Sequence, residues 1–338
     1  MTEFIRRVRK MLDSAGEKKG RRLLLGVRVP QTLEECHRLG YDVPTWIKEG
    51  LIDYVSPADF FFSDFNAKYE EFAELTRASD CYLYPTIQPL LCHRDDAHRL
   101  TLDQYRAVVQ NFYGAGADGL SVHNYPYHWG HLIWKASIRK SYPGPADNYP
   151  KMLDYFKILK DPQALAEGAR HYLFYPLWPR RSPSDTIKND RAVLSRSEAG
   201  ERVTYRFRIC ERLPETVELA INSQELYEGA YNKAGKAHGV RVIFRAIGLV
   251  PGDEIAVDVN GEKIVAENIR HIWHQDGRSG WDGRPLPAYT EFQFMLAAPP
   301  GIYGDNQLGL KIIKNASGAE GDIVVDEVEV LVQPKNLP

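Results

Sequence analysis

The chain has 338 residues and a formal net charge of −2, with acidic and basic residues interspersed along it. This length is sufficient for two domains, each with its own core. The balanced charge excludes the basic surface that is typical of nucleic-acid binding or of attachment to anionic membranes, so we expect neither partner.

The cysteines and the amino terminus carry no targeting or metal-site signal. Cys36, Cys81, Cys92 and Cys210 lack the paired spacing of zinc sites and of disulfide frameworks, so we expect reduced thiols. No apolar run approaches the ~20 residues of a membrane helix, and the amino terminus lacks the apolar centre of a signal peptide. The chain as encoded is therefore predicted to be cytoplasmic, and no cofactor is expected.

The first third of the chain alternates helix-like and strand-like segments. Apolar residues at helical spacing predict a helix over residues 4–12, and the apolar run 23–30 predicts a buried strand that ends at a proline. Thr32 and Glu35 have capping-box spacing, which indicates a helix start. Further helices are predicted over residues 43–48, 70–78, 102–113 and 148–160, and further strands over 52–56, 81–87 and 119–122.

These segments make about four β/α units. Gly114 and Gly116 precede a strand instead of joining a strand to a helix, so they do not form a phosphate-binding loop. A closed (β/α) barrel needs eight units. Either the chain is the carboxyl-terminal half of a longer barrel, or two copies meet to cover the open sheet edges as a homo-oligomer.

Beyond a linker over residues 179–185, rich in Pro, Arg and Ser, the apolar pattern changes to a period of two. Strands are predicted over residues 203–209, 217–221, 240–244, 254–259, 289–296, 307–313 and 323–332. Asn260 and Gly261 indicate a hairpin turn. The predicted fold is α/β plus all-β: a partial (β/α) TIM-type barrel in residues 1–178, followed by an antiparallel, jelly-roll-like β-sandwich in residues 179–338.

Several sequence phrases resemble a known family. LLLGVRVPQTLEECHRLGYDVPTWIKEGLIDYVSPADFF and GADGLSVHNY resemble the later half of the family-10-like glycosyl hydrolase proteins, which are bacterial TIM-barrel proteins with an appended β-sandwich. LVPGDEIAVDVNGEKI, GDNQLGLKI and VDEVEVLVQ resemble the appended domain. The resemblance implies a carbohydrate ligand. The acidic strand ending of the type Asp-Gly-Ile-Glu-Leu-Asp lies ahead of the matched region in such proteins and does not occur here, so the catalytic pair is expected to be incomplete.

Glycoside hydrolysis needs two carboxyl groups, one on each side of the scissile bond. Asp59 is the candidate catalytic residue because it follows the second strand beside three phenylalanines, residues 60–62. Apolar neighbours raise the pKa of a carboxyl, as a general acid requires. The alternative is that Asp59 or Asp64 caps the following helix. Asp118 lies at the amino end of its strand and is expected to be structural.

The candidate substrate-binding residues are Arg28, Gln88, His123, Asn124, Tyr125, Tyr127 and Trp129. The first four fall at the carboxyl ends of predicted strands, where they can hydrogen-bond sugar hydroxyls, and the three aromatic residues can stack on a pyranose. The alternatives are an ion pair at the barrel rim for Arg28 and packing under the loop 126–149 for the aromatic residues.

Other polar clusters in the sequence have structural alternatives. His93, His98, His123, His128 and His131 are read as loop histidines without a metal, because only His128 and His131 are close in the chain. In the second domain Trp273, His274, Asp276 and Trp281 are predicted to lie in a Gly-rich loop that either binds sugar or anchors itself.

No serine has a glycine two positions away on each side, which excludes the common serine-hydrolase motif. The sequence therefore predicts a glycoside-hydrolase-like protein that acts on or binds carbohydrate. The alternative is a non-catalytic carbohydrate-binding or assembly protein that uses the β-sandwich. A placed pair of carboxyl groups favours the enzyme.

Overall fold

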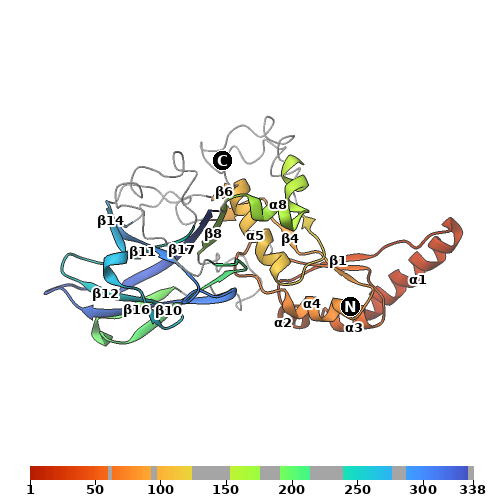
Figure 1. The fold of residues 1–338 in the computed structure, drawn as a ribbon. Coiled ribbons are helices and arrows are strands. Elements are labelled where there is room, and N and C mark those ends of the chain that lie inside the picture. The colour runs from red at the N-terminus through yellow and green to blue at the C-terminus, as the bar shows by residue number, and fades with distance from the viewer. Residues whose placement is uncertain are drawn as a thin grey trace, which may run out of the picture. The chain divides into compact units, whose positions relative to one another are not determined.

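The computed structural model describes residues 1–59, 63–92, 97–123, 153–175, 191–213, 239–275 and 287–333 (Figure 1). The chain divides into two compact units. The first unit comprises Met1–Leu91, Asn111–Lys160 and Pro179–Ile187, and the second comprises Cys92–Gln110, Asp161–Trp178 and Lys188–Pro338. One of the boundaries between the units falls within α5 (Leu102–Gly114).

The first unit contains a parallel sheet whose strands follow the order of the chain. β1 (Gly26–Val29), β2 (Tyr54–Pro57) and β3 (Tyr82–Leu83) pair in that order, and β4 (Thr86–Ile87) pairs in parallel with β7 (Ser121–Val122). All four predicted strands of this region are confirmed. The third is interrupted at Pro85, which has no N–H to donate but accepts a hydrogen bond from Ser121 N at 3.0 Å.

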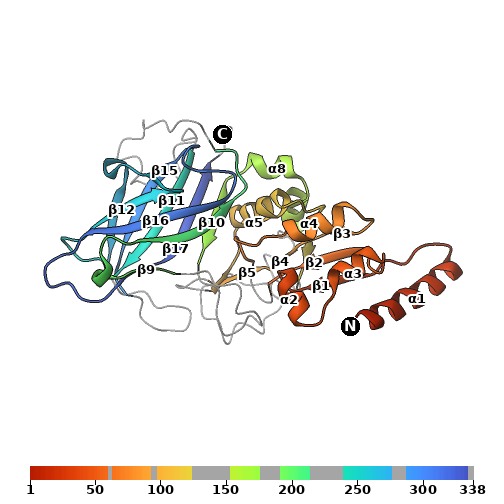
Figure 2. The ribbon, with the colours of Figure 1, turned by 90° about the horizontal axis from the view of Figure 1, so that it is seen from below.

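Helices connect these strands (Figure 2). They are α1 (Thr2–Lys19), α2 (Leu33–Arg38), α3 (Val43–Lys48), α4 (Glu70–Arg77) and α5, and residues 153–159 are also helical. Thr32 Oγ1 accepts a hydrogen bond from Glu35 N at 3.1 Å, which confirms the predicted helix start. Mixed α/β structure is therefore established for this unit, and a TIM-type barrel stays a prediction.

The two faces of the parallel sheet differ in character. Val55 and Leu83 are fully buried on the apolar face. Because side chains alternate along a strand, the register of β1, β2 and β3 places Gly26, Tyr54 and Tyr82 together on the opposite face.

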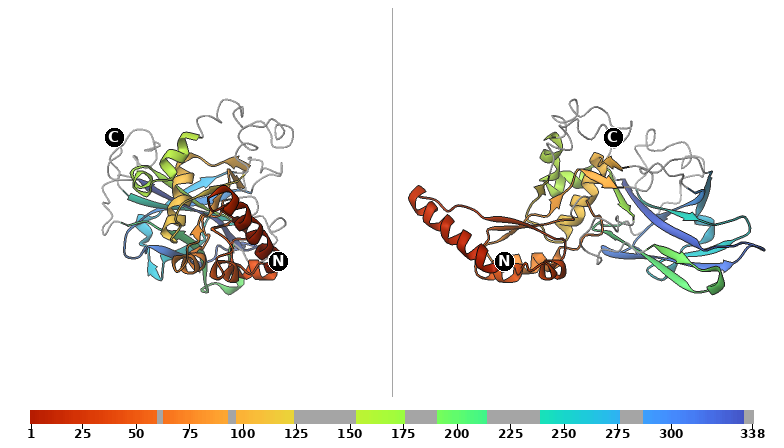
Figure 3. Two further views of the ribbon diagram at one scale, coloured as in Figure 1. Left: turned by 90° about the vertical axis from the view of Figure 1, so that its right-hand side faces the viewer. Right: turned by 180° about the vertical axis from the view of Figure 1, so that it is seen from behind.

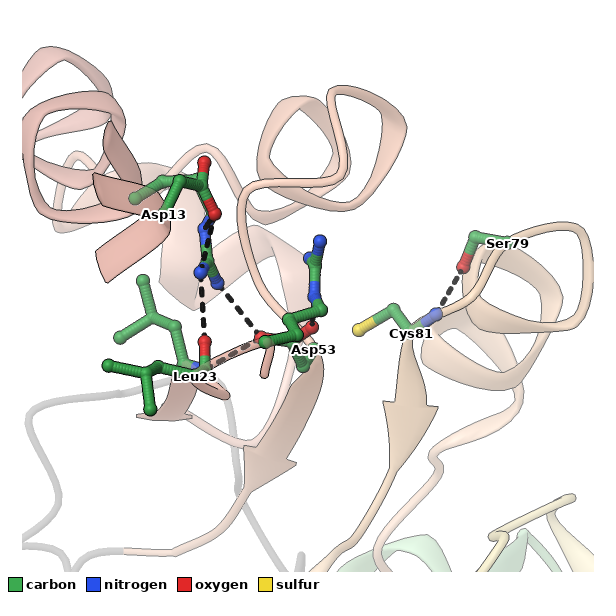
Figure 4. Close-up of polar contacts among 8 residues, drawn as sticks. Asp13, Leu23, Asp53, Ser79 and Cys81 are labelled. Carbon is green, nitrogen blue, oxygen red and sulfur yellow. Dashed lines mark hydrogen bonds and ion pairs between the residues drawn. The ribbon is translucent and has the colours of Figure 1, made fainter. Parts of the chain in front are cut away.

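A charged network holds the amino edge of this sheet (Figure 4). Asp53 accepts hydrogen bonds from Arg9 Nη1 at 3.0 Å, Arg22 Nε at 2.6 Å and the backbone N of Leu25 at 2.6 Å. Arg9 also donates to the carbonyl oxygen of Leu23 at 2.8 Å. The network therefore ties α1 to the amino ends of β1 and β2.

The second unit contains two antiparallel sheets, seen as two layers in Figure 3. The first has the order β10 (Arg202–Ile209), β16 (Gly304–Lys314), β12 (Glu254–Val259) and β13 (Glu262–Lys263). The second has the order β14 (Arg270–His274), β15 (Tyr289–Leu296), β11 (Gly239–Ile247), β17 (Ile323–Gln333) and β8 (Arg170–Phe174), with β9 (Ala192–Leu194) also on β17. The remaining elements are β5 (Leu90–Cys92), β6 (Ala97–Arg99), α8 (Pro162–Glu167), η2 (Arg196–Glu198) and η3 (Ala266–Asn268).

Aromatic side chains fill the interior of this unit. The rings of Phe174 in β8 and Phe207 in β10 are 5.9 Å apart and join the two sheets. Within the second sheet Phe244 stacks on Phe292 with 4.6 Å between ring centroids. These contacts place the core between the sheets.

The predicted strands of the second half are confirmed where the structure describes them, and residues 217–221 lie outside the described residues. The Asn260-Gly261 turn is also confirmed, with φ values of 54° and 89° between paired strands. The prediction that Trp273 and His274 lie in a loop is wrong, because both belong to β14 and pair with β15. Asp276 and Trp281 lie outside the described residues.

Within the described part of the chain, no helix has the length and apolarity that crossing a membrane requires. Cys36, Cys81 and Cys210 are buried, and none of them forms a disulfide within the described residues.

Candidate functional site

The carboxyl edge of the parallel sheet collects polar residues from four strand ends. The carbonyl oxygen of Asp59, just after β2, accepts hydrogen bonds from Arg28 Nη2 at 2.8 Å and from Gln88 Nε2 at 3.1 Å. Gln88 is only 1 % exposed, whereas Arg28 stays exposed. Arg28 and Gln88 therefore hold the backbone that carries the Asp59 carboxyl. Whether either contacts a sugar stays a prediction.

The segment that follows β2 has further anchors. Ser63 Oγ donates to the carbonyl oxygen of Gln88 at 3.0 Å and accepts from the backbone N of Gln88 at 2.9 Å. Asn111 Nδ2 donates to the carbonyl oxygen of Phe65 at 2.8 Å. These bonds fix the segment against the end of β4 and against α5.

Asp64 is a buried carboxyl next to this edge. It is 5 % exposed and accepts hydrogen bonds from Gln31 Nε2 at 2.6 Å and from the backbone N of Asn66 at 2.8 Å. Burial raises the pKa of Asp64 to about 6, and the nearby charge of Asp59 adds a smaller increase. The proposed helix-capping role is wrong, because α4 has Tyr69 as its N-cap and no side-chain cap.

Electrostatic effects link the other members of the edge. Burial lowers the pKa of His123, and the positive charge of Arg28 lowers it further, so the imidazole is neutral at pH 7 and can both donate and accept. Partial burial lowers the pKa of Arg28, which the Asp59 carboxylate opposes. Burial raises the pKa of Tyr69, with additions from the charges of Asp64 and Asp59. These side chains therefore lie within electrostatic reach of one another.

The structure thus brings Arg28, Asp59, Gln88 and His123 to one edge, as their positions in the sequence predict. Asn124, Tyr125, Tyr127 and Trp129 lie outside the described residues. Among the described residues Arg28 makes no ion pair, so the rim ion pair is replaced by its bond to a carbonyl oxygen. Asp118 Oδ2 accepts from the backbone N of Leu83 at 2.8 Å, a structural role at the opposite edge.

Sequence reasoning missed Gln31, Ser63 and Asp64 as members of this edge. Gln31 had a signal, because it directly follows the proline that ends the first strand. Ser63 and Asp64 belong to the segment after β2, and its position depends on hydrogen bonds to residues that are distant in the chain. In the described ranges no group of three or more His, Cys, Asp or Glu side chains is arranged to hold a metal ion.

No protein-family model matches the chain, and no curated protein matches it. Three solved structures show distant likenesses. A two-domain esterase (CEX) active on acetylated mannans is 10% identical, with 84% of this chain and 74% of that chain covered and a TM-score of 0.26. Its co-crystal with mannopentaose is 10% identical, with 86% and 75% covered and a TM-score of 0.23. 

The catalytic domain of a GH87 alpha-1,3-glucanase, in complex with tetrasaccharides, is 13% identical. The match covers 51% of this chain and 28% of that chain, with a TM-score of 0.19. At these TM-scores the likenesses support neither a fold assignment nor a function. The resemblance to family-10-like glycosyl hydrolases stays a prediction that rests on the sequence phrases.

Proposed function

We propose that this chain is a glycoside-hydrolase-like protein that acts on carbohydrate at the carboxyl edge of its parallel sheet. In this proposal the β/α units form part of a TIM-type barrel, and the two antiparallel sheets form an accessory β-sandwich. The sequence resemblance supports the substrate class. The polar residues gathered at the strand ends support the location, because barrel enzymes place their sites at that edge.

The observation that carries the proposal is the buried Asp64 carboxyl at the same edge as Asp59. Glycosidases use two carboxyl groups whose surroundings hold them in different protonation states. Asp64 provides a carboxyl with a pKa of about 6, and its electrostatic interaction with Asp59 supports their proximity. Asp59 is proposed to act on the sugar, and Asp64 to take up a proton as the pH falls through about 6.

Non-catalytic carbohydrate binding is the second candidate, and burial favours it. Asp59 is 8 % exposed and Asp64 is 5 % exposed, and both oxygens of Asp64 already accept hydrogen bonds. A carboxyl in that position can shape a binding site without reaching a glycosidic bond.

Reducing-sugar release from a panel of polysaccharides separates the two candidates. We expect release by the wild-type chain and its loss, by about 100-fold or more, in Asp59→Asn. Asp118→Asn makes the same chemical change at the opposite edge and is the matched control, with release near the wild-type level. Sugar binding without any release supports the binder. Equal release by the wild type and Asp59→Asn contradicts a role for this carboxyl.

A further inference from the structure

A cavity of about 1040 Å³ opens at the amino edge of the parallel sheet, away from the carboxyl-edge site. It is lined by residues that precede β2 and β3, among them Asp53 and Cys81, and by Tyr54, Tyr82 and Tyr84. Figure 4 shows Asp53 and Cys81 at the starts of neighbouring strands. Ligand sites usually have volumes of about 300 to 1,000 Å³, so this cavity is large enough for a small molecule or several sugar rings.

Three tyrosines, Tyr54, Tyr82 and Tyr84, form what we call the tyrosine floor of this cavity. The ring centroids of Tyr82 and Tyr84 are 5.8 Å apart with an angle of only 4° between the planes, and Tyr54 lies 5.6 Å from Tyr84. The ring of Tyr54 is tilted by 41° from that of Tyr84, so only the Tyr82–Tyr84 pair is near-parallel. Each ring combines an apolar face with a hydroxyl group at its tip.

Two glycines make room for the tyrosine floor. A Cβ at Gly26 of β1 would overlap the ring of Tyr54, so that ring lies directly on the backbone of the neighbouring strand. A Cβ at Gly119 would approach the ring of Tyr84 to 3.1 Å. Tyr54 and Tyr84 are therefore fitted closely against the backbone at Gly26 and Gly119.

Tyr82 remains 54 % exposed although it belongs to a parallel sheet. Parallel sheets normally have both faces covered, so an exposed aromatic ring on such a face is a surface open to a ligand or to another protein layer. A sugar ring suits it, because its apolar C–H face stacks on an aromatic ring while its hydroxyls reach polar groups around it.

The polar groups around the cavity suit an uncharged ligand. The Asp53 carboxylate is paired with Arg9 and Arg22 and is not free to hold a cation. Exposed Lys48, Glu74 and Asp80 line the same cavity and provide charges of both signs. Neither sign dominates strongly enough to select an anion, whereas both signs can hydrogen-bond hydroxyl groups.

We propose that this amino-edge cavity is a second carbohydrate-binding site, in which a neutral pyranose stacks on Tyr82. The inference rests on the proposed function for the class of ligand, and it adds a site remote from Asp59. Its role would be to hold a polysaccharide chain while the carboxyl edge acts on it.

The test is calorimetric titration of the full chain carrying Asp59→Asn, which prevents turnover, with cellopentaose, mannopentaose and xylopentaose in turn. We expect at least one pentaose to bind, and Tyr82→Ala to raise its Kd about three- to tenfold. Tyr82→Phe keeps the ring, so its Kd should stay within about twofold. Because Tyr82 is exposed, neither change should alter the fold, which far-UV circular dichroism checks.

Three outcomes overturn the inference: no pentaose binds, Tyr82→Ala leaves the Kd unchanged, or Tyr82→Ala lowers the sedimentation coefficient of a self-associated chain and leaves sugar affinity intact. The last outcome would identify the floor as a contact between copies. Failure of the proposed function is separate: Tyr82-dependent binding without sugar release supports the cavity and contradicts the hydrolase. Asp59-dependent release without Tyr82-dependent binding supports the hydrolase and contradicts the cavity site.

Discussion

Asp64 is the residue of the carboxyl edge whose protonation the structure perturbs most clearly. Its carboxyl is buried, and the amide of Gln31 donates to it at 2.6 Å, while Gln31 Oε1 has no hydrogen-bond partner among the described residues. Rotation of that amide would let a protonated Asp64, or an amide in its place, donate to Gln31 Oε1. A neutral group at this position could therefore be hydrogen-bonded by Gln31 after that rotation.

This gives a prediction for Asp64→Asn. The pKa of Asp64 is about 6 in the folded chain against an ordinary 3.8, so the folded state binds the proton more tightly than the unfolded state. The contribution of Asp64 to the free energy of unfolding therefore grows as the pH falls from about 6 to about 4. Above and below that range the contribution does not change with pH. The substitution removes this dependence.

Urea unfolding of the wild type and Asp64→Asn between pH 4 and pH 7.5 measures the effect. On going from pH 4 to pH 7 the wild type loses the Asp64 contribution and the variant does not. We therefore expect the free energy of unfolding of the variant, relative to that of the wild type, to rise by about 2 kcal/mol. Parallel stability curves for the two proteins across this range would show that Asp64 titrates normally.

Residue-level prediction succeeded where a side chain sits at the end of a recognisable strand. Arg28, Asp59, Gln88 and His123 were placed at one edge by that rule alone. The rule did not reveal that Arg28 and Gln88 both donate to the Asp59 carbonyl oxygen. That arrangement depends on the exact path of the segment after β2, for which the sequence has no local signal.

At the scale of elements, local signals fixed the helices well. The predicted helix over residues 43–48 has the bounds of α3, and the Thr32 cap of α2 is made as expected. β8 and β14 were not predicted as strands, because each is defined by pairing with a strand elsewhere in the chain. β8 precedes the predicted domain boundary at residue 178, yet its partner is β17 near the carboxyl terminus.

A buried ion pair joins β8 to the segment after β10 in the second unit. Arg170 donates to the two carboxylate oxygens of Glu211 at 2.6 and 2.8 Å, and Tyr172 Oη donates to the same carboxylate at 2.6 Å. Both members of the ion pair are almost fully buried. Removal of one member of such a pair lowers the free energy of unfolding strongly, because the other charge stays buried without a partner.

We therefore expect Glu211→Ala to lower the free energy of unfolding by about 3 to 5 kcal/mol. Glu254→Ala is the matched control, since Glu254 forms an exposed ion pair with Lys314 at 2.8 Å and should change the urea midpoint little. Chemical unfolding at pH 7 compares them. Similar midpoints for both variants would mean that the Arg170–Glu211 pair does not hold the sheets together.

At the scale of the whole molecule, the sequence predicted an α/β part followed by antiparallel sheets, and the structure has both. The change of apolar period does not give the bounds of the two compact units, because residues 92–110 and 161–178 belong to the second unit although they precede that change. The partial TIM-type barrel of about four β/α units and the pairing of two copies stay predictions, because strand patterns report local structure and not how a sheet closes. The location proposed for the site also depends on how the sheet closes, because the carboxyl edge is the expected place for a site only in a barrel.

The most direct measurement for the account is a crystal structure of the Asp59→Asn chain with the pentaose that binds most tightly. The account predicts a sugar ring at the carboxyl edge, within hydrogen-bond distance of the substituted side chain and near Arg28 and His123. Density for the pentaose only elsewhere on the chain, with the carboxyl edge occupied by water, would contradict it.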